Sequence, residues 1–135
     1  NWRVSGEKNL EKLLTLMQPK LLDGNFVFCT ITDGDLSDIL KLAPIASFQE
    51  EEGLSLLSSQ QNADEANIKY DSVLKGITLS VHSSLDAVGF TAAVANKLAS
   101  NGIPANVVAA YYHDHVFVPA DKAQFALQLL TELAE

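Results

Sequence analysis

The chain has 135 residues, of which 47% are hydrophobic and 19% are charged, and its formal net charge is −8. This composition is typical of a globular protein and excludes a disordered chain, and the length suits one domain of ordinary size or two very small ones that share a sheet. The negative charge argues against nucleic acid and anionic membranes as partners, because both would repel it.

The first half of the chain alternates between helical and strand patterns. Apolar residues recur at helical spacing from Leu10 to Leu21, which predicts a helix over residues 9–18 that ends at Pro19. The other elements expected here are a strand at 26–31, a helix at 36–42, a hairpin of strands at 45–49 and 54–58, and a short helix or turn at 63–68. Cys29 is the only cysteine, so no internal disulfide can form, and we expect a buried, inert thiol.

The second half shows clearer patterns. A long strand, or two consecutive ones, is expected over residues 70–82, with a break or bulge at Lys75–Gly76. An alanine-rich stripe predicts a helix over 88–100, and Gly102 fits a left-handed residue just past its end. Two strands at 106–112 and 116–118 and an amphipathic helix at 120–134 complete the chain.

One motif within residues 76–119 resembles a known family. Asp86-Ala87-Val88-Gly89 leads from a strand into the alanine-rich helix, and Asn101-Gly102-Ile103 then leads to the next strand. This pattern resembles the ACT domain, most of all the regulatory segments of aspartate kinases, although Val88 stands where the family pattern Asp-x-Pro-Gly has proline. The resemblance covers about residues 74–133. It implies an α+β protein with a ferredoxin-like βαββαβ fold, an antiparallel sheet and helices on one face.

A weak internal repeat extends this interpretation to the whole chain. Residues 26–68 and 76–133 share the order strand, helix, strand, strand, helix, although few residues are identical. The repeat predicts two ACT-like units in tandem, 1–69 and 70–135, with residues 70–81 shared as the last strand of one unit and the first strand of the next.

The loop between the strand and the helix of the second unit is the candidate ligand site. Free backbone N–H groups at a helix start suit a carboxylate, and Gly89 allows a close approach of ligand or backbone. The resemblance adds the strand that flanks effectors in amino-acid-binding members. The predicted ligand-binding residues are Ser84, Leu85, Asp86, Ala87, Val88, Gly89, Phe90, Asn106 and Val107. The alternative is structural: Asp86 caps the helix and Gly89 relieves crowding between helix and sheet.

His113-Asp114-His115 permits a second kind of site. In an extended segment both imidazoles lie on one face, and two histidines with a carboxylate can ligate zinc or iron, with His82 as the only other histidine. A polar hairpin turn explains the same residues and is the interpretation we favour. The acidic residues Asp33, Asp35 and Asp38 lack the spacing of a calcium loop, so we expect Asp35 to cap a helix with Asp38 in its first turn.

The function expected from these residues is the binding of a small metabolite, most simply an amino acid, by a regulatory or sensor protein without catalysis or cofactor. The chain contains no catalytic elbow, phosphate-binding loop, dinucleotide fingerprint or H-E-x-x-H motif. No apolar run of 18 residues and no signal-peptide pattern is found, so we expect a cytoplasmic protein. The strands expected at 76–81 and 106–112 leave sheet edges or a face to be buried against a second copy, which predicts a homodimer. Two alternatives stay open: an oligomeric interaction module without a ligand, and a small metal-dependent enzyme that uses His113 and His115.

Overall fold

The computed structural model of this protein describes residues 9–81 and 88–135. Contacts between residues divide the chain into two compact units. One unit is formed by Asp23–Leu74, and we call it the inserted unit; the other is formed by Asn1–Leu22 and Lys75–Glu135, and we call it the terminal unit. The sequence units expected above, 1–69 and 70–135, follow the repeat rather than these contacts and stay a prediction.

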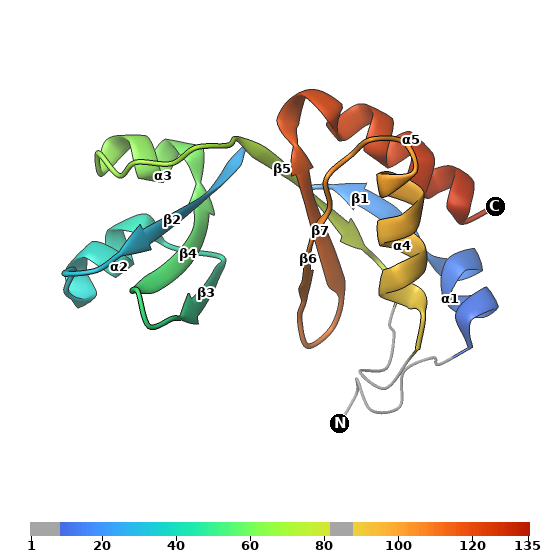
Figure 1. Ribbon diagram of the computed structural model, residues 1–135, viewed down its shortest axis with the longest axis horizontal. Coiled ribbons are helices and arrows are strands. Elements are labelled where there is room, and N and C mark those ends of the chain that lie inside the picture. Colours follow the sequence, from blue (N-terminus) through green and yellow to red (C-terminus); the bar gives the residue numbers. More distant parts are fainter. Residues whose placement is uncertain (1–8, 82–87) are drawn as a thin grey trace. The chain divides into compact units, whose positions relative to one another are not determined.

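The inserted unit is a three-stranded antiparallel sheet with two short helices. Its elements are β2 (Phe26–Ile31), α2 (Leu36–Leu42), β3 (Ala46–Gln49), β4 (Leu54–Ser59) and α3 (Gln60–Glu65). The strand order is β3-β4-β2 (Figure 1). On the side of β2 away from β4, the one strand pairing within the described part of the chain joins Phe26 to Leu74 at the start of β5. The helix predicted at 36–42 and the hairpin are confirmed.

Alternation along β2 separates the two faces of this sheet. Val27 and Cys29 are buried, whereas Phe28 and Thr30 between them are exposed. The buried pair packs with Leu42, Leu56 and Ala63 from the helices and β4. The predicted burial of the Cys29 thiol is therefore confirmed, and this burial raises its pKa.

The terminal unit combines the beginning of the chain with its second half. Its elements are α1 (Leu10–Leu16), β1 (Pro19–Leu21), β5 (Leu74–Leu79, whose first residue belongs to the inserted unit), α4 (Phe90–Ala99), β6 (Asn106–Ala109), β7 (Asp114–Pro119), the 3₁₀ turn η1 (Ala120–Lys122) and α5 (Ala123–Leu133). The strand order is β1-β5-β7-β6. Figure 1 shows α4 and α5 together against this sheet. None of the helices within the described ranges is long and apolar enough to cross a bilayer.

β1 takes the place of the fourth strand in the terminal unit. Counted from β5, a βαββαβ unit would add its last strand after α5, but here the edge beside β5 is filled by a strand from near the start of the chain. β1 pairs antiparallel with β5 from Pro19↔Leu79 to Leu21↔Ile77, and Leu22 N–H donates to Gly76 O at 2.8 Å. The α+β, ferredoxin-like prediction of two units is thus confirmed, and the edge strand comes from an unexpected place in the sequence.

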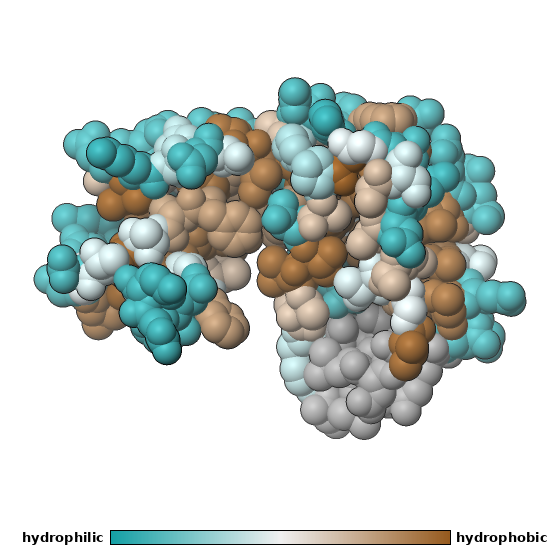
Figure 2. Space-filling model, viewed as in Figure 1, coloured by the Kyte–Doolittle hydropathy of each residue, from teal (hydrophilic) through white to brown (hydrophobic). Residues whose placement is uncertain are grey.

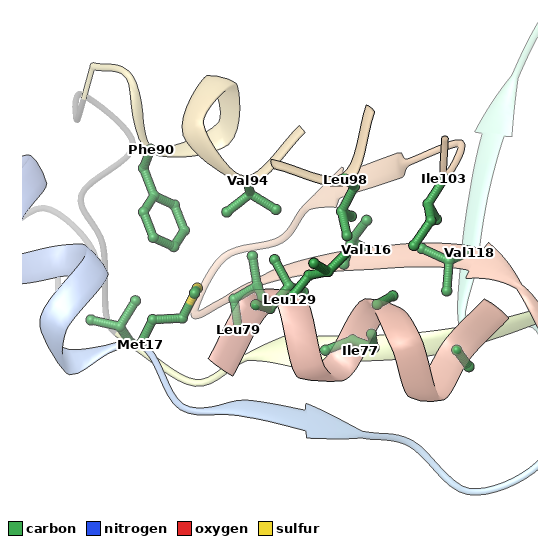
Figure 3. Packing of buried hydrophobic residues seen from close by; sticks show 14 of the residues in the cluster. Met17, Ile77, Leu79, Phe90, Val94, Leu98, Ile103, Val116, Val118 and Leu129 are labelled. Atoms are coloured by element: carbon green, nitrogen blue, oxygen red, sulfur yellow. The ribbon is translucent and has the colours of Figure 1, made fainter. Parts of the chain in front are cut away.

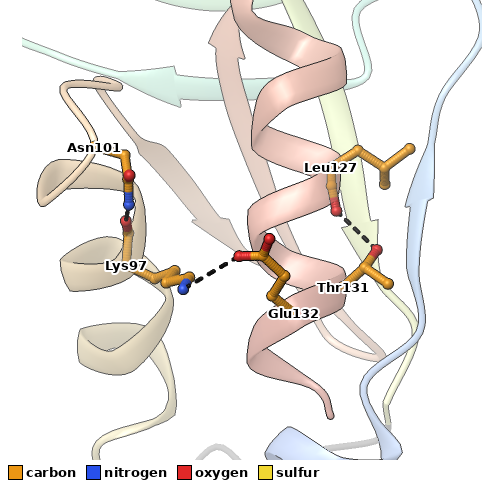
Figure 4. A network of polar contacts seen from close by, with 5 residues as sticks. All are labelled: Lys97, Asn101, Leu127, Thr131 and Glu132. Atoms are coloured by element: carbon orange, nitrogen blue, oxygen red, sulfur yellow. Dashed lines mark hydrogen bonds and ion pairs between the residues drawn. The ribbon is translucent and has the colours of Figure 1, made fainter.

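One hydrophobic core holds the terminal unit together. Side chains from β5, α4, β7 and α5 meet between the sheet and the helices, and Met17 reaches them from the end of α1 (Figure 3). At the surface, Lys97 Nζ of α4 lies 3.5 Å from Glu132 Oε2 of α5, and Asn101 Nδ2 donates a hydrogen bond to Lys97 O at 2.9 Å (Figure 4). Exposed ion pairs contribute under about 1 kcal/mol, so apolar burial is the dominant stabilising term.

Four local predictions can be compared with the structure. Gly102 has φ +74°, which confirms the left-handed residue past α4. The break expected at Lys75–Gly76 is wrong, because β5 runs through it; a Cβ at Gly76 would lie 2.7 Å from Phe117 Cε2, so the glycine makes room for that ring.

β6 ends at Ala109, three residues before the expected end, because a turn follows it. α3 begins at Gln60 rather than 63, because Ser59 Oγ caps it by accepting from Asn62 N–H at 3.1 Å.

Candidate ligand site

A surface hollow lies in the inserted unit where β2 passes into α2. Its volume is about 400 Å³. It is lined by Thr30, Ile31, Thr32, Gly34, Asp38, Lys41, Leu42, Ala66 and Ile68. We call it the first hollow. Residues from β2, from α2 and from the chain after α3 therefore meet around one space of small-molecule size.

A capping box fixes the loop that forms this hollow. Asp35 is the N-cap of α2, and its Oδ1 accepts from Asp38 N–H at 3.2 Å, while Asp38 Oδ2 accepts from Asp35 N–H at 3.1 Å. Ser37 Oγ also donates to Asp35 Oδ1 at 2.6 Å. The Ser37 and Asp38 hydrogen bonds favour the carboxylate form and lower the pKa of Asp35. The predicted capping role of Asp35 and Asp38 is confirmed.

Gly34 sets the shape of the same loop. A Cβ built on Gly34 would overlap the Ile31 side chain and come within 3.5 Å of Asp38 Oδ2. The loop therefore packs tightly onto the end of β2 only because this residue has no side chain.

The walls of the first hollow are chemically mixed. Asp38 and Lys41 lie three residues apart on α2, which places a carboxylate and an ammonium group on one side of that helix. Ile31, Leu42 and Ile68 supply an apolar wall. Such a surface suits a small molecule that carries both charges and an apolar part.

A second hollow, of about 340 Å³, lies beside the first along β2. It is lined by Phe28, Cys29, Thr30, Ser55, Lys69, Tyr70 and Asp71, so the two hollows share Thr30. The Tyr70 hydroxyl donates to Asp64 Oδ1 at 2.7 Å and accepts from Gln60 Nε2 at 3.0 Å. These bonds hold the chain after α3 to α3 itself.

Part of the site predicted from the sequence lies outside the described residues, namely Ser84, Leu85, Asp86 and Ala87. Of the rest of that loop, Val88 is exposed, Gly89 is the N-cap of α4 with φ +92°, and Phe90 is buried in the core. Among the residues that the structure describes, no side chain caps α4 at Gly89. The helix therefore begins with a glycine whose backbone conformation other residues rarely adopt.

Asn106 and Val107 begin β6, which follows the end of α4. Asn106 Nδ2 donates to Phe117 O at 3.1 Å, and Val107 packs against the hydrophobic core. Because ten helical residues span about 15 Å, Gly89 and Asn106 lie toward opposite ends of α4. The assignment of a ligand to these residues stays a prediction.

The segment His113-Asp114-His115 is not wholly the hairpin turn expected above, because Asp114 and His115 already belong to β7. His115 lies in β7 and its Nδ1 is 3.0 Å from Thr78 Oγ1 of β5. Burial lowers the pKa of His115, with a further contribution from His113, while Asp114 acts in the opposite direction. Within residues 9–81 and 88–135, no group of three or more His, Cys, Asp or Glu side chains is placed to hold a metal ion.

Sequence reasoning missed both hollows. The signal that could have found the first is the repeat itself: strand, polar loop and helix recur at 26–42, with Asp33-Gly34-Asp35 in the loop. An interpretation of Asp35 and Asp38 as capping residues alone assigns no role to Thr32 and Lys41, which line the hollow.

Family models match the chain along nearly its whole length. One ACT-domain model matches residues 5–75, and a second ACT-domain model matches residues 73–132. The chain belongs to the ACT-domain family. ACT regulatory domains are non-catalytic, and the tandem expected from the sequence repeat is confirmed. Among curated proteins, none matches this ACT-domain chain.

Solved structures of other proteins have a similar fold. A Vibrio cholerae protein of unknown function, described as a possible transport protein, is 53% identical with a TM-score of 0.85; the match covers 95% of this chain and 98% of that one. The regulatory subunit of aspartate kinase from Thermus thermophilus has a TM-score of 0.62 at 14% identity, over 87% of this chain and 97% of that one. The regulatory subunit of aspartate kinase from Thermus flavus has a TM-score of 0.55 at 15% identity, and the match covers 88% of this chain and 97% of that one. The two kinase subunits share the fold.

Proposed function

We propose that this protein is a regulatory module that binds an amino acid in the first hollow and carries no catalytic activity of its own. The observation that carries the proposal is that Lys41 and Asp38 line the same hollow as the apolar residues Ile31, Leu42 and Ile68. An amino acid has the matching set of groups: its carboxylate suits Lys41, its ammonium suits Asp38, and its side chain suits the wall. Burying an aliphatic side chain there contributes about 1.5–3 kcal/mol.

Family membership supports the regulatory part of this proposal. The likeness to aspartate-kinase regulatory subunits is a likeness of fold, and it agrees with a module that senses a metabolite for a partner. A cytoplasmic location, expected from the sequence, belongs to the same proposal.

A melting screen with the twenty amino acids tests the proposal. A ligand at a hundredfold excess over its dissociation constant stabilises the folded state by about 2.7 kcal/mol, which raises the melting temperature measurably. Lys41→Met should abolish most of that rise, because it removes the positive charge and keeps the side-chain length. Lys12→Met, on the exposed side of α1, is the matched control and should keep the full rise.

Two other results would contradict the proposal. If none of the amino acids raises the melting temperature, the amino-acid function fails. If one does and Lys41→Met responds like Lys12→Met, the ligand binds elsewhere. The loop Ser84–Phe90 with Asn106 and Val107, predicted from the sequence, is then the next candidate, because α4 begins at the end of this loop and no side chain in the described part of the chain caps that helix.

Self-association is the second function we propose, and exposed apolar side chains favour it. Large apolar side chains reach the surface in both units (Figure 2). In the inserted unit they are Phe28, Leu36, Leu40, Ile45 and Phe48. A two-fold dimer would cover such a surface. Sedimentation at micromolar concentration should give a species of twice 14.6 kDa, and a species of 14.6 kDa alone would contradict the dimer.

A further inference from the structure

The main chain of β2 has an open hydrogen-bonding edge. Gln60 N–H donates to Asn25 O at 2.9 Å, so residues 25 and 60 form a hydrogen-bonded pair. Hydrogen-bonded and non-hydrogen-bonded pairs alternate along antiparallel strands. In the register of β2 and β4, the next hydrogen-bonded pairs are therefore 27/58, 29/56 and 31/54. The N–H and C=O groups of Phe28 and Thr30 therefore point away from β4.

The chain on the other side of β2 does not use these groups. β5 pairs with β2 only at Phe26↔Leu74, and the segment 66–73 before it diverges from β2 toward α3 (Figure 1). Ile68 N–H donates to Ala63 O at 2.9 Å, and Tyr70 bonds to α3 as described above. Among the described residues, no backbone hydrogen bond joins segment 66–73 to Phe28 or Thr30.

The two hollows lie along this open edge, and different faces of the sheet contribute to their linings. The first includes Ile31 and Leu42 on the helix-covered face, and the second includes Phe28 and Ser55 on the other face. Thr30 lines both. Successive side chains of an extended chain point to opposite faces, so a chain lying along β2 would direct adjacent side chains into different hollows.

We infer that this edge binds a short extended peptide by strand addition. The peptide backbone pairs with the N–H and C=O groups of Phe28 and Thr30, which supply affinity without regard to sequence. An apolar side chain enters the first hollow. Its neighbour enters the second hollow, where Tyr70 offers an aromatic face and Lys69 and Asp71 offer charges. The inference goes beyond the proposed function, because a peptide backbone on β2 and an apolar side chain in the first hollow need neither the Lys41 charge nor the Asp38 charge.

Amide hydrogen exchange gives a test with an internal control. In the free protein, the amides of Phe28 and Thr30 should exchange faster than those of Val27 and Cys29, which bond to β4. The probe is the capped tripeptide acetyl-Ala-Leu-Ala-amide, and its binding should slow exchange at Phe28 and Thr30. Equal protection of all four amides in the free protein would overturn the inference, because the edge would then already be paired.

Two N-methylated forms of the tripeptide test the pairing itself. Methyl groups are placed either on the leucine nitrogen or on the nitrogen of the following alanine. Alternate N–H groups of a bound strand point to β2, so one form should lose at least about tenfold in affinity and the other should keep it. Equal affinities would overturn the inference.

Protein variants and the free amino acid complete the comparison. Thr30→Pro removes the N–H that faces the peptide, and Thr30→Val keeps it; only the proline variant should lose binding. If Thr30→Pro fails to fold, the two methylated peptides still decide the question. If a free amino acid raises the melting temperature while the tripeptide does not bind, the proposed function stands and the peptide inference fails. If neither binds, both fail.

Discussion

At the scale of single residues, Ser58 and Ser59 show how neighbouring hydroxyl groups differ. Ser58 is fully buried and its Oγ has no hydrogen-bond partner among the described residues, whereas Ser59 Oγ caps α3. Ser58→Ala should leave stability unchanged or raise it by up to about 1 kcal/mol, because an unpaired buried hydroxyl costs free energy. Ser59→Ala should lower it by about 1 kcal/mol through the lost cap. Urea unfolding of both variants measures this, and a clear loss in Ser58→Ala would reveal a partner for its hydroxyl.

At the same scale, His115 makes the stability of the fold depend on pH. Burial and, less strongly, His113 lower its folded pKa below the ordinary value of 6.5, against the opposing effect of Asp114. The unfolded state therefore binds the proton more readily, so this contribution to stability is fully present above about pH 6.5 and is lost as the pH falls. The melting temperature of the wild type should fall further between about pH 7.5 and pH 5 than that of His115→Gln. Parallel pH curves for the two proteins would contradict this.

At the scale of secondary-structure elements, α1 offers a matched pair of leucines. Leu13 is 0% exposed in the terminal core and Leu16 is 57% exposed on the same helix. Leu13→Ala should cost about 2–5 kcal/mol, because it leaves a cavity, whereas Leu16→Ala should cost under about 0.5 kcal/mol. Denaturant unfolding measures both losses. Similar small losses would mean that α1 is not docked on the sheet in solution.

The same scale shows what the sequence could predict. Helical spacing and β-branched runs placed α2, β2, β4 and α4 within a few residues, because these patterns report which side of an element is buried. The patterns failed at Gly76, where the deciding contact is the distant ring of Phe117. They also missed the first hollow, whose walls come from residues up to 38 positions apart, Thr30 and Ile68. The spacing of residue types along the chain does not show which distant residues contact one another in the fold.

At the scale of the whole molecule, the two units defined by the sequence repeat, 1–69 and 70–135, differ from the two units defined by contacts between residues. Residues 9–22 supply α1 and β1 to a sheet and core whose other members begin at Lys75. The inserted unit, in contrast, is continuous from Asp23 to Leu74. A repeat in the sequence locates strands and helices but does not say which strand closes which sheet, because the closing strand can come from either end of the chain.

This arrangement predicts how fragments of the chain behave. A fragment of residues 70–135 lacks β1, so the edge of β5 is unpaired, and it lacks Leu13 and Met17 from its core. We expect no cooperative thermal transition from it by circular dichroism, since a unit of that size has little stability to lose. Adding a synthetic peptide of residues 1–22 should restore the transition in proportion to peptide concentration, because binding to the folded state alone stabilises it by mass action. A Leu13→Ala peptide is the control and should restore less. If residues 70–135 alone melt cooperatively at the temperature of the full chain, β1 is dispensable and the sequence boundary near residue 69 is also the physical one.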